Sequence, residues 1–345
     1  MTQPKPLFTI AIPTWNRGQL LKKSLEQLQL ELVHTEAGQV EILVSDNASS
    51  DDTQLIVQRL IKDGLSITSI RNEVNVGSDA NIAACFNKAS GKYVLILGDD
   101  DLFVDHSLSK VLSILCAKEY GVVYLRAYGF EQDFRKEFPG KYGTNREYTD
   151  NADYLVRLSS RMTFISSCII NRDLLPDVNA NEYCGSNLVQ VELVLQAALA
   201  AKQNYYVGEY IIACFRNNSS GYDYSTVFVN NLCSILDKYQ SERFSATAVR
   251  CIENNMLLAF YPYHLTMQRI NNPEIDKTTL DNFNRRFHGH RFFSIFVLPI
   301  LNLPRPLAIF WGAIMMFVGR SLNGDLNRVF YFGWHKIKKQ FKKLN

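Results

Sequence analysis

Three consecutive carboxylates, Asp99 to Asp101, follow an apolar run at Tyr93–Leu97 and the single residue Gly98. A short apolar run of this kind is typical of a strand in a parallel sheet that is covered on both faces. The acids then lie at the carboxyl end of the strand, where open α/β sheets bind their ligands. Adjacent carboxylates repel one another unless a cation or the donors of a ligand offset the charge. The run therefore predicts a metal and phosphate site, and a solvated acidic turn is the alternative.

Two more polar loops follow predicted strands earlier in the chain. Asp46 and Asn47 come after the strand at 40–44, and Arg71 comes after the strand at 66–70. A carboxylate can accept a hydrogen bond from a nucleotide base, an amide can both donate and accept, and a guanidinium can bind phosphate. These residues predict a nucleotide site on the same sheet edge as the acids. A turn or helix-capping carboxylate is the alternative role for Asp46.

Strand and helix patterns alternate over the first hundred residues, and this alternation predicts an α/β fold with a doubly wound, mostly parallel sheet sandwiched by helices. The predicted strands lie at 7–12, 40–44, 66–70 and 93–97, and the predicted helices at 18–32, 53–61 and 79–89. Pro13 is expected to end the first strand, because proline cannot donate to a central ladder.

Bulk composition excludes several classes of protein. The 345 residues are 47% apolar, enough for one large or two ordinary domains, and the net charge of +3 is too small to indicate nucleic acid. Seven scattered cysteines without a C-x-x-C pair predict reduced thiols rather than disulfides or zinc. No apolar signal segment precedes Thr9, so a cytoplasmic location is expected. Neither G-x-G-x-x-G nor a P-loop motif occurs, which argues against dinucleotide dehydrogenases and P-loop enzymes.

Segments at 12–17, 44–53, 72–81 and 89–101 together resemble the family 2 glycosyltransferases, inverting enzymes with the GT-A fold. Their order and spacing agree over residues 7–115. The resemblance implies that the first loops hold a nucleotide-sugar donor, with Asp46 on its base, and that the acids hold a divalent metal bridging the diphosphate. The implied donor-binding residues are Pro13, Thr14, Asn16, Arg17, Asp46, Asn47, Arg71, Asn75, Asp99 and Asp100.

Gly98 departs from the family pattern, because many relatives carry a first Asp there. Gly-Asp-Asp-Asp looks more like the branch that includes abequosyltransferases and related deoxysugar transferases of bacterial O-antigen assembly. This likeness implies Asp101 as the direct metal ligand, with Asp99 as a further candidate, and leaves Asp99 or Asp100 for ribose or water. Oxygen ligands beside a diphosphate favour Mg²⁺ or Mn²⁺.

Inverting transfer needs a general base that removes the proton of the acceptor hydroxyl. Relatives carry this base at the start of a helix after the donor half, and the usual Asp position falls here on Gln190, which cannot take a proton. Glu192 is the nearest carboxylate and the predicted base. A structural salt bridge or an exposed helix edge explains Glu192 equally well. Asp153, Glu182 and Asp223 are the reserve candidates.

The chain divides into a donor-binding half at 1–120, an acceptor-binding half at 121–224 and a helical C-terminal region at 225–345. Within these ranges the sequence predicts a buried helix at 188–201, strands at 205–207 and 211–215, and helical structure at 227–270. Arg216, in the loop that follows, is a candidate diphosphate contact, and a solvated loop arginine is the alternative.

The last part of the chain predicts contact with a membrane surface. Its longest unbroken apolar run, 307–318, is shorter than the roughly 20 residues that a bilayer crossing needs. Trp334, Ile337, Phe341 and Leu344 recur at helical spacing among five lysines, which predicts a basic amphipathic helix in the headgroup plane. We therefore expect a peripheral protein on the inner face of the plasma membrane. A core helix with a solvated basic end is the alternative.

These features favour a metal-assisted glycosyltransferase of bacterial surface polysaccharide synthesis. It would move a sugar, with a deoxyhexose as one candidate, from a nucleotide-sugar to a glycan or polyprenyl-linked glycan acceptor. A catalytically inactive nucleotide-sugar-binding or scaffolding protein is the alternative, because Gln190 stands at the usual base position. A nucleotidyltransferase is disfavoured, since no Gly-rich basic loop follows the first strand.

Overall fold

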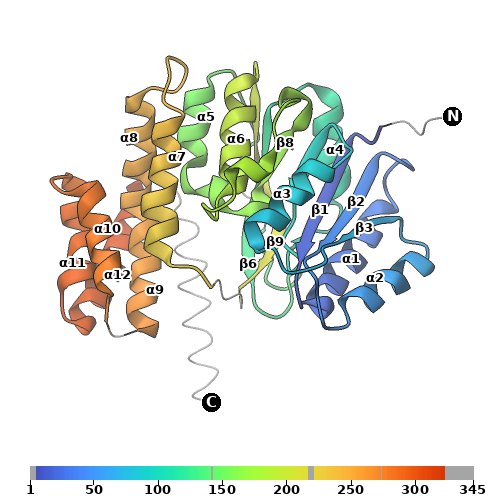
Figure 1. Ribbon diagram of the computed structural model, residues 1–345. Helices are drawn as coiled ribbons and strands as arrows, with labels where there is room; N and C mark the ends of the chain where they lie inside the picture. Colours follow the sequence, from blue (N-terminus) through green and yellow to red (C-terminus); the bar gives the residue numbers. More distant parts are fainter. Residues whose placement is uncertain (1–4, 141–142, 217–220, 273, 323–345) are drawn as a thin grey trace. The chain divides into compact units, whose positions relative to one another are not determined.

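The computed structural model describes residues 5–140, 143–216, 221–272 and 274–322, and these form two compact units (Figure 1). The first unit comprises the chain up to Gly221 together with Ser241–Phe244. The second comprises Tyr222–Gln240 and the chain from Ser245 onward. The predicted amphipathic segment at 334–344 lies outside the described residues.

The first unit begins with the predicted alternation of strands and helices, which is confirmed. The strands are β1 (Phe8–Thr14), β2 (Val40–Asp46), β3 (Ile67–Arg71) and β4 (Tyr93–Ile96), and the helices between them are α1 (Gly18–Leu32), α2 (Thr53–Lys62) and α3 (Ser78–Lys88). All three pairings among these strands are parallel, in the order β3-β2-β1-β4. The carboxyl ends of four strands therefore meet at one edge.

The remainder of the first unit extends this sheet with strands of both directions. Its elements are β5 (Leu102–Phe103), α4 (Ser107–Ala117), β6 (Val122–Phe130), β7 (Arg146–Tyr148), α5 (Asn151–Leu158), β8 (Cys168–Asn171), α6 (Val189–Ala200) and β9 (Asn204–Phe215). Strand β8 lies antiparallel between β4 and β6, and β9 runs parallel to β6. The full order is β3-β2-β1-β4-β8-β6-β9-β5, with β7 on β9. The sheet is thus parallel around β1 and mixed beyond β4.

Alternating side chains of the strands build the core on the two faces of the sheet. Phe8, Ile10 and Ile12 are fully buried and pack in one cluster with apolar residues of α1, α2 and α4. Helix α3 covers the opposite face of β1 and β2 (Figure 1). Helices on both faces hold the loops at the carboxyl edge in fixed positions.

Two predicted strand boundaries are wrong. Pro13 lies inside β1, opposite Ser45, rather than after it. Pairing of β1 with β4 has already ended at Ala11, so the missing N–H of Pro13 breaks no ladder on that side. The predicted strands at 205–207 and 211–215 form the single strand β9, which passes through Gly208.

The second unit is helical, as the sequence predicts. It contains α7 (Leu232–Lys238), α8 (Ala246–Asn255), α9 (Tyr261–Asn271), α10 (Lys277–Phe287), α11 (Leu298–Asn302) and α12 (Arg305–Leu322), with π-helical turns at Thr226–Asn231, Met256–Phe260 and Phe293–Val297. Arg286 of α10 pairs with Asp237 of α7 and Glu253 of α8, both at 2.6 Å. Among the described residues, no helix is both long and apolar enough to cross a bilayer.

Candidate active site

The three acids form a buried turn directly after β4. Asp99, Asp100 and Asp101 are each 7% exposed or less, and the N–H of Asp101 donates to the carbonyl of Gly98 at 3.0 Å. Ser24 of α1 donates its hydroxyl to the carbonyl of Asp101 at 2.9 Å, which anchors the turn to the first helix. A Cβ added at Gly98 would lie 2.8 Å from Asp101 Oδ2, closer than real side chains approach. The glycine therefore makes room for the carboxylate of Asp101.

The loop after β1 neutralises part of this charge. Thr14 Oγ1 donates to Asp99 Oδ2 at 2.8 Å. The guanidinium of Arg17 spans two of the acids, with Nη1 2.9 Å from Asp99 Oδ1 and Nη2 2.5 Å from Asp100 Oδ2. Thr14 and Arg17 therefore hold Asp99 and Asp100 in place, and all four belong to the predicted donor-binding set.

Asp101 has a different partner, which the sequence did not suggest. The hydroxyl of Ser166 donates to Asp101 Oδ2 and accepts the N–H of Gly98 at 2.9 Å. Ser166 lies in a short 3₁₀ turn, Ile165–Ser167, far along the chain from the acids. Its hydroxyl clamps both ends of the acidic turn.

Burial raises the pKa of two of the acids. It raises the pKa of Asp99 to about 6, although the charge of Arg17 and the hydrogen bond from Thr14 act in the opposite direction. Burial, and next the charge of Asp100, raises the pKa of Asp101 well above its usual value. Arg17 supplies a single positive charge against three carboxylates. A cation at this turn would offset the remaining charge.

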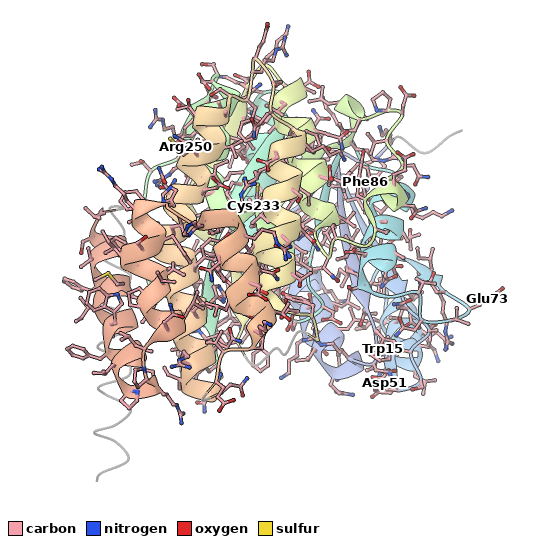
Figure 2. The ribbon with its side chains drawn as sticks, turned by 60° about the vertical axis from the view of Figure 1, so that its left-hand side comes forward. Trp15, Asp51, Glu73, Phe86, Cys233 and Arg250 are labelled. Atoms are coloured by element: carbon pink, nitrogen blue, oxygen red, sulfur yellow. The ribbon has the colours of Figure 1, made fainter. Side chains whose placement is uncertain are left out.

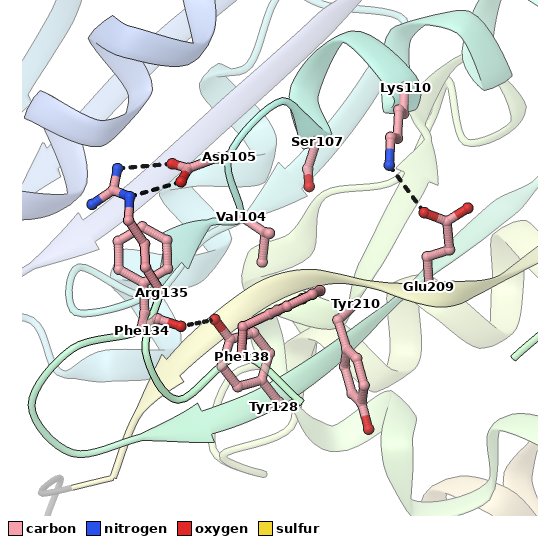
Figure 3. Close-up of a pocket in the computed structure, with 10 residues that line it drawn as sticks. All are labelled: Val104, Asp105, Ser107, Lys110, Tyr128, Phe134, Arg135, Phe138, Glu209 and Tyr210. Atoms are coloured by element: carbon pink, nitrogen blue, oxygen red, sulfur yellow. Dashed lines mark hydrogen bonds and ion pairs between the residues drawn. The ribbon is translucent and has the colours of Figure 1, made fainter. Parts of the chain in front are cut away.

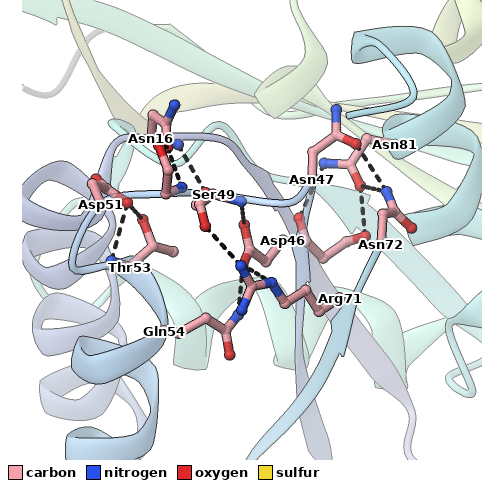
Figure 4. Close-up of polar contacts among 12 residues, drawn as sticks. Asn16, Asp46, Asn47, Ser49, Asp51, Thr53, Gln54, Arg71, Asn72 and Asn81 are labelled. Carbon is pink, nitrogen blue, oxygen red and sulfur yellow. Dashed lines mark hydrogen bonds and ion pairs between the residues drawn. The ribbon is translucent and has the colours of Figure 1, made fainter. Parts of the chain in front are cut away.

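The second loop places Asp46 level with Thr14 and Arg71 in the parallel ladder. Asp46 is completely buried: Oδ1 accepts the N–H of Ser49 at 2.9 Å, and Oδ2 accepts Nε2 of Gln54 at 2.6 Å. Arg71 Nε lies 3.4 Å from Asp46 Oδ2, and its Nη2 donates to the carbonyl of Ser49 at 2.8 Å (Figure 4). The carboxylate is therefore held rigidly at the sheet edge.

Asparagine side chains join the loops after β2 and β3. Asn47 Nδ2 donates to Asn75 Oδ1 at 2.8 Å, while Asn47 Oδ1 accepts Asn72 Nδ2 and the N–H of Val76, both at 2.9 Å. Asn81 of α3 accepts a hydrogen bond from the hydroxyl of Ser45 at 2.7 Å and donates one to the carbonyl of Ser45 at 3.0 Å. This network fixes Asn47 and Asn75 beside Asp46.

Asn16 and Asp51 join the loops after β1 and β2. Asn16 adopts a positive φ of 53°, which asparagine tolerates better than most residues, and its Oδ1 accepts the N–H of Ser50 at 2.7 Å. Asp51 accepts the N–H of Gly18 at 3.0 Å and the N–H of Thr53 at 3.1 Å, so one carboxylate serves the first turns of both α1 and α2. Figure 2 shows Trp15 and Asp51 on these two loops.

The acids do not converge on a single point. Among the described residues, no three His, Cys, Asp or Glu side chains are placed to hold a metal ion. Asp99 and Asp100 face Arg17, and Asp101 faces Ser166. The chemistry of the turn nevertheless fits a hard divalent cation, since it offers buried carboxylate oxygens with raised pKa values at Asp99 and Asp101.

Helix α6 carries the candidate base in its first turn. Glu192 is 5% exposed, and the helix is buried on almost all sides, as predicted. Nε2 of Gln190 donates to the carbonyl of Thr163 at 2.8 Å, which ties Gln190 to the segment that also carries Ser166. Residues two apart on a helix point in roughly opposite directions. Gln190 and Glu192 therefore lie on different faces of α6.

The structure brings most of the predicted donor residues to one sheet edge, in two groups. Thr14 and Arg17 surround the acids, and Asp46, Asn47, Arg71 and Asn75 form the second group. Sequence reasoning missed Ser166, Gln54 and Ser24, which hold these side chains. No local pattern identifies them, because each is a common polar residue that acts through a distant contact.

Comparison with known proteins identifies the domain that carries this site. The sequence model of glycosyl transferase family 2 matches residues 9–177. These residues form a family 2 glycosyltransferase domain. The family 2 domain contains the acidic turn, both donor loops and Ser166, and α6 begins after its end.

Curated relatives share parts of the chain. This chain is 28% identical over 208 residues to GalNAc(5)-diNAcBac-PP-undecaprenol beta-1,3-glucosyltransferase of Campylobacter jejuni. The matched region covers 59% of this chain and 62% of the relative. The chain is 36% identical over 105 residues to abequosyltransferase RfbV of Salmonella typhimurium, covering 30% and 31%. The chain thus spans less than two thirds of the length of these relatives.

Solved structures confirm the predicted GT-A fold. S. aureus TarS 1–349 in complex with UDP-GlcNAc superposes with a TM-score of 0.61 at 17% identity, over 91% of this chain and 89% of that one. Mannosyltransferase PcManGT from Pyrobaculum calidifontis, in complex with GDP-Man and Mn²⁺, gives a TM-score of 0.51 at 15% identity, over 93% and 87%. Because both identities are below 20%, these likenesses show the fold alone.

Proposed function

We propose that this chain transfers a sugar from a nucleotide-sugar to a lipid-linked glycan acceptor in bacterial surface polysaccharide synthesis. The observation that carries the proposal is the buried acidic turn held by Thr14 and Arg17 at the carboxyl edge of a family 2 domain. Asp46, Asn47 and Asn75 border the same edge and supply the hydrogen-bonding groups that a nucleoside needs.

Donor binding divides between the two loop groups. Pro13, Thr14, Asn16 and Arg17 bind the nucleoside side of the donor, Asp46 binds its base, and Arg71 binds phosphate. Asp101, with Asp99, would hold Mg²⁺ or Mn²⁺, and a metal ion there would offset the charge of the departing diphosphate. The raised pKa of Asp99 and of Asp101 supports this assignment, because such acids gain most from a nearby cation. The Mn²⁺ complex of the mannosyltransferase neighbour also supports a divalent metal.

Transfer with inversion forms one bond and breaks another at the anomeric carbon. The acceptor oxygen bonds to that carbon while its bond to the diphosphate oxygen breaks, and the hydroxyl proton passes to a base. We assign the base role to Glu192, with Asp153, Glu182 and Asp223 as reserves. The position of Glu192 supports this choice, since it lies in the first turn of the helix that follows the donor half.

The acceptor assignment rests on the Campylobacter relative, whose name specifies an undecaprenol-linked substrate, and on the second unit. Leu307, Phe310, Ile314 and Phe317 lie at helical spacing on α12 and are 38–66% exposed. Helix α12 contains no acidic residue. An apolar stripe of this size without acids suits the inner leaflet of the plasma membrane, which would bring the enzyme to a polyprenyl-linked acceptor. The Salmonella relative supports a deoxyhexose as one candidate sugar.

The decisive experiment is a donor screen. Purified protein is incubated with UDP-, dTDP-, GDP- and CDP-sugars, with Mg²⁺, Mn²⁺ or EDTA, and release of nucleoside diphosphate is measured. We expect metal-dependent release from one donor, and a loss of about 100-fold or more in Asp99→Asn. Release from no donor under any of these conditions would favour an inactive binding protein.

A pair of variants tests the base. Glu192→Gln should reduce sugar transfer by about 100-fold or more while donor affinity stays unchanged, because the amide cannot accept the proton. Glu147→Gln is the matched control, since Glu147 is an exposed, ion-paired glutamate in the same unit. Substantial transfer by Glu192→Gln would move the base to one of the reserve residues.

A further inference from the structure

A cavity of about 240 Å³ lies in the first unit, between the start of α4, the middle of β9 and the loop after β6 (Figure 3). None of its lining residues belongs to the proposed donor-binding set or to α6. Its volume is large enough for one sugar ring. The cavity is therefore a second candidate site, separate from the donor site.

Three aromatic rings form one side of the cavity. Tyr128 of β6, Phe138 of the following loop and Tyr210 of β9 contact one another edge to face, with ring centroids 5.5 to 6.3 Å apart. The hydroxyl of Tyr128 donates to the carbonyl of Phe134 at 2.5 Å, which fixes that ring. Edge-to-face packing of this kind holds rings at defined angles. Tyr128 and Tyr210 are buried, and the partly exposed ring of Phe138 is the one that a ligand can reach.

Two ion pairs form the flanks, on opposite sides of the rings in Figure 3. Arg135 binds Asp105 through Nε and Nη2, both at 2.7 Å, and Gln27 of α1 contacts both partners at 3.0 Å. Lys110 binds Glu209 at 3.0 Å. Their side chains are 35–52% exposed, so each pair remains open to a ligand. Every cation is matched by a carboxylate, and the lining carries no net charge.

We propose that this cavity binds a neutral pyranose ring of the glycan chain. An apolar sugar face can lie against the ring of Phe138, and neighbouring hydroxyls can accept from Lys110 or Arg135 while donating to Glu209 or Asp105. A carboxylate or phosphate group would have to compete with Asp105 and Glu209 for Arg135 and Lys110, whose charges these two carboxylates already offset. The inference rests on the proposed function only in taking the ring to be part of the acceptor or product.

A short, sheet-bound segment of the chain connects the cavity to the acidic turn. Asp101 and Asp105 lie at the two ends of one short segment, and its middle forms β5. Leu102 and Phe103 pair with Ala213 and Ile212 of β9, the strand that also supplies Glu209 and Tyr210. A sugar bound here would thus be held at a fixed position relative to the acids. Such a site would select acceptors that carry a sugar beyond the one being extended.

Saturation-transfer NMR on the full chain tests the proposal. The probes are methyl glycosides of neutral hexoses and N-acetylhexosamines, with glucuronic acid and glucose 1-phosphate as charged comparators. We expect binding of at least one neutral glycoside and not of the charged sugars. Lys110→Met and Phe138→Ala should each weaken this binding at least fivefold. Lys118→Met is the matched control, because Lys118 forms a similar exposed pair with Glu147 outside the cavity, and it should bind as the wild type does.

Three outcomes would overturn the proposal: no binding of any neutral glycoside, equal binding by Lys110→Met and the wild type, or preference for a charged sugar. Lys110→Met alters an exposed side chain, so it keeps the test decisive if Phe138→Ala does not fold. Release of nucleoside diphosphate is measured on the same variants. A variant that still releases nucleoside diphosphate but no longer binds the glycoside would support the second site. If the wild type released no nucleoside diphosphate, that result would count against the proposed function alone.

Discussion

At the scale of single residues, Gly98 explains how three adjacent acids can be buried together. Its missing side chain leaves space that the carboxylate of Asp101 occupies, and Ser166 closes the turn from the other side. An aspartate at this position, which the family resemblance leads us to expect, would need a different arrangement of Asp101. The packing of this turn therefore requires a glycine at position 98.

We expect Gly98→Ala to disturb the acids directly. The new methyl group would push against Asp101 Oδ2, which Ser166 prevents from moving freely, and should cost about 1–3 kcal/mol of stability as well as weaken metal dependence. Thermal unfolding and the Mn²⁺ concentration for half-maximal activity measure the two effects. Gly221→Ala is the control, because a Cβ there meets no atom within 4 Å. Equal behaviour of the two variants would contradict this account.

Variants of Asp46 and Asp51 can distinguish a carboxylate that binds the donor from one that only stabilises the loop. Both carboxylates accept backbone N–H groups in the loop after β2, so Asp46→Asn and Asp51→Asn should each lose about 1–2 kcal/mol of stability. Only Asp46→Asn should also raise the KM for the nucleotide-sugar. Chemical denaturation and donor titration measure these effects. An unchanged KM in Asp46→Asn would leave Asp46 as a turn carboxylate.

The sequence predicts which residues reach this edge but not what holds them. Strand ends and polar loops locate Asp46, Arg71 and the acids, because parallel strands bring their carboxyl ends together. Ser166 and Gln54 escape prediction because their partners depend on the tertiary arrangement. The sequence places Arg17 in the donor-binding set but does not predict that its guanidinium pairs with Asp99 and Asp100.

At the scale of elements, the first four strands were predictable and the later ones less so. Buried parallel strands read as continuous apolar runs bounded by loops, which marks β1 and β4 clearly, whereas β3 at the sheet edge has no buried residue. The insertion of β8 between β4 and β6 reverses direction, and no local pattern records such an order. Strand β9 also continues through Gly208, where the N–H donates to Asn145 at 2.9 Å. Glycine in a strand marks a close approach here rather than an end.

His264 of α9 gives the second unit a specific response to pH. Its ring stacks on Tyr224 and contacts Phe260, and burial lowers its pKa from 6.5 to about 4. Below pH 6.5 the unfolded chain takes up a proton that the folded ring does not. Stability should therefore be complete above that pH and fall as pH decreases toward 4, by up to about 3 kcal/mol.

We expect His264→Phe to remove this part of the acid sensitivity, since phenylalanine keeps the ring contacts and cannot be protonated. Denaturation midpoints at pH 7 and pH 5 provide the measurement. His288→Phe, at an exposed position, is the matched control. If both variants lost stability between these pH values as the wild type does, His264 would not be the responsible group.

At the scale of the whole molecule, the exposed stripe on α12 is a candidate for membrane contact. We expect the full chain to sediment with vesicles that contain anionic lipid. Phe310→Glu with Phe317→Glu should reduce the bound fraction about tenfold or more, because each ring loses the free energy of burial in the bilayer and gains a repelled charge. Leu55→Glu is the matched control, since Leu55 is 69% exposed on α2. Equal sedimentation of the two variants would exclude α12 as the contact.

Strand β4 also has a consequence for how the chain is made. Its four residues are entirely apolar or aromatic and buried, and one of its two neighbours in the sheet, β8, lies far downstream in the sequence. During synthesis the strand pairs first with β1 and keeps an unpaired hydrophobic edge until Cys168–Asn171 emerges from the ribosome. We therefore expect the segment that ends in the acidic turn to be prone to aggregation in a nascent chain until β8 has been made.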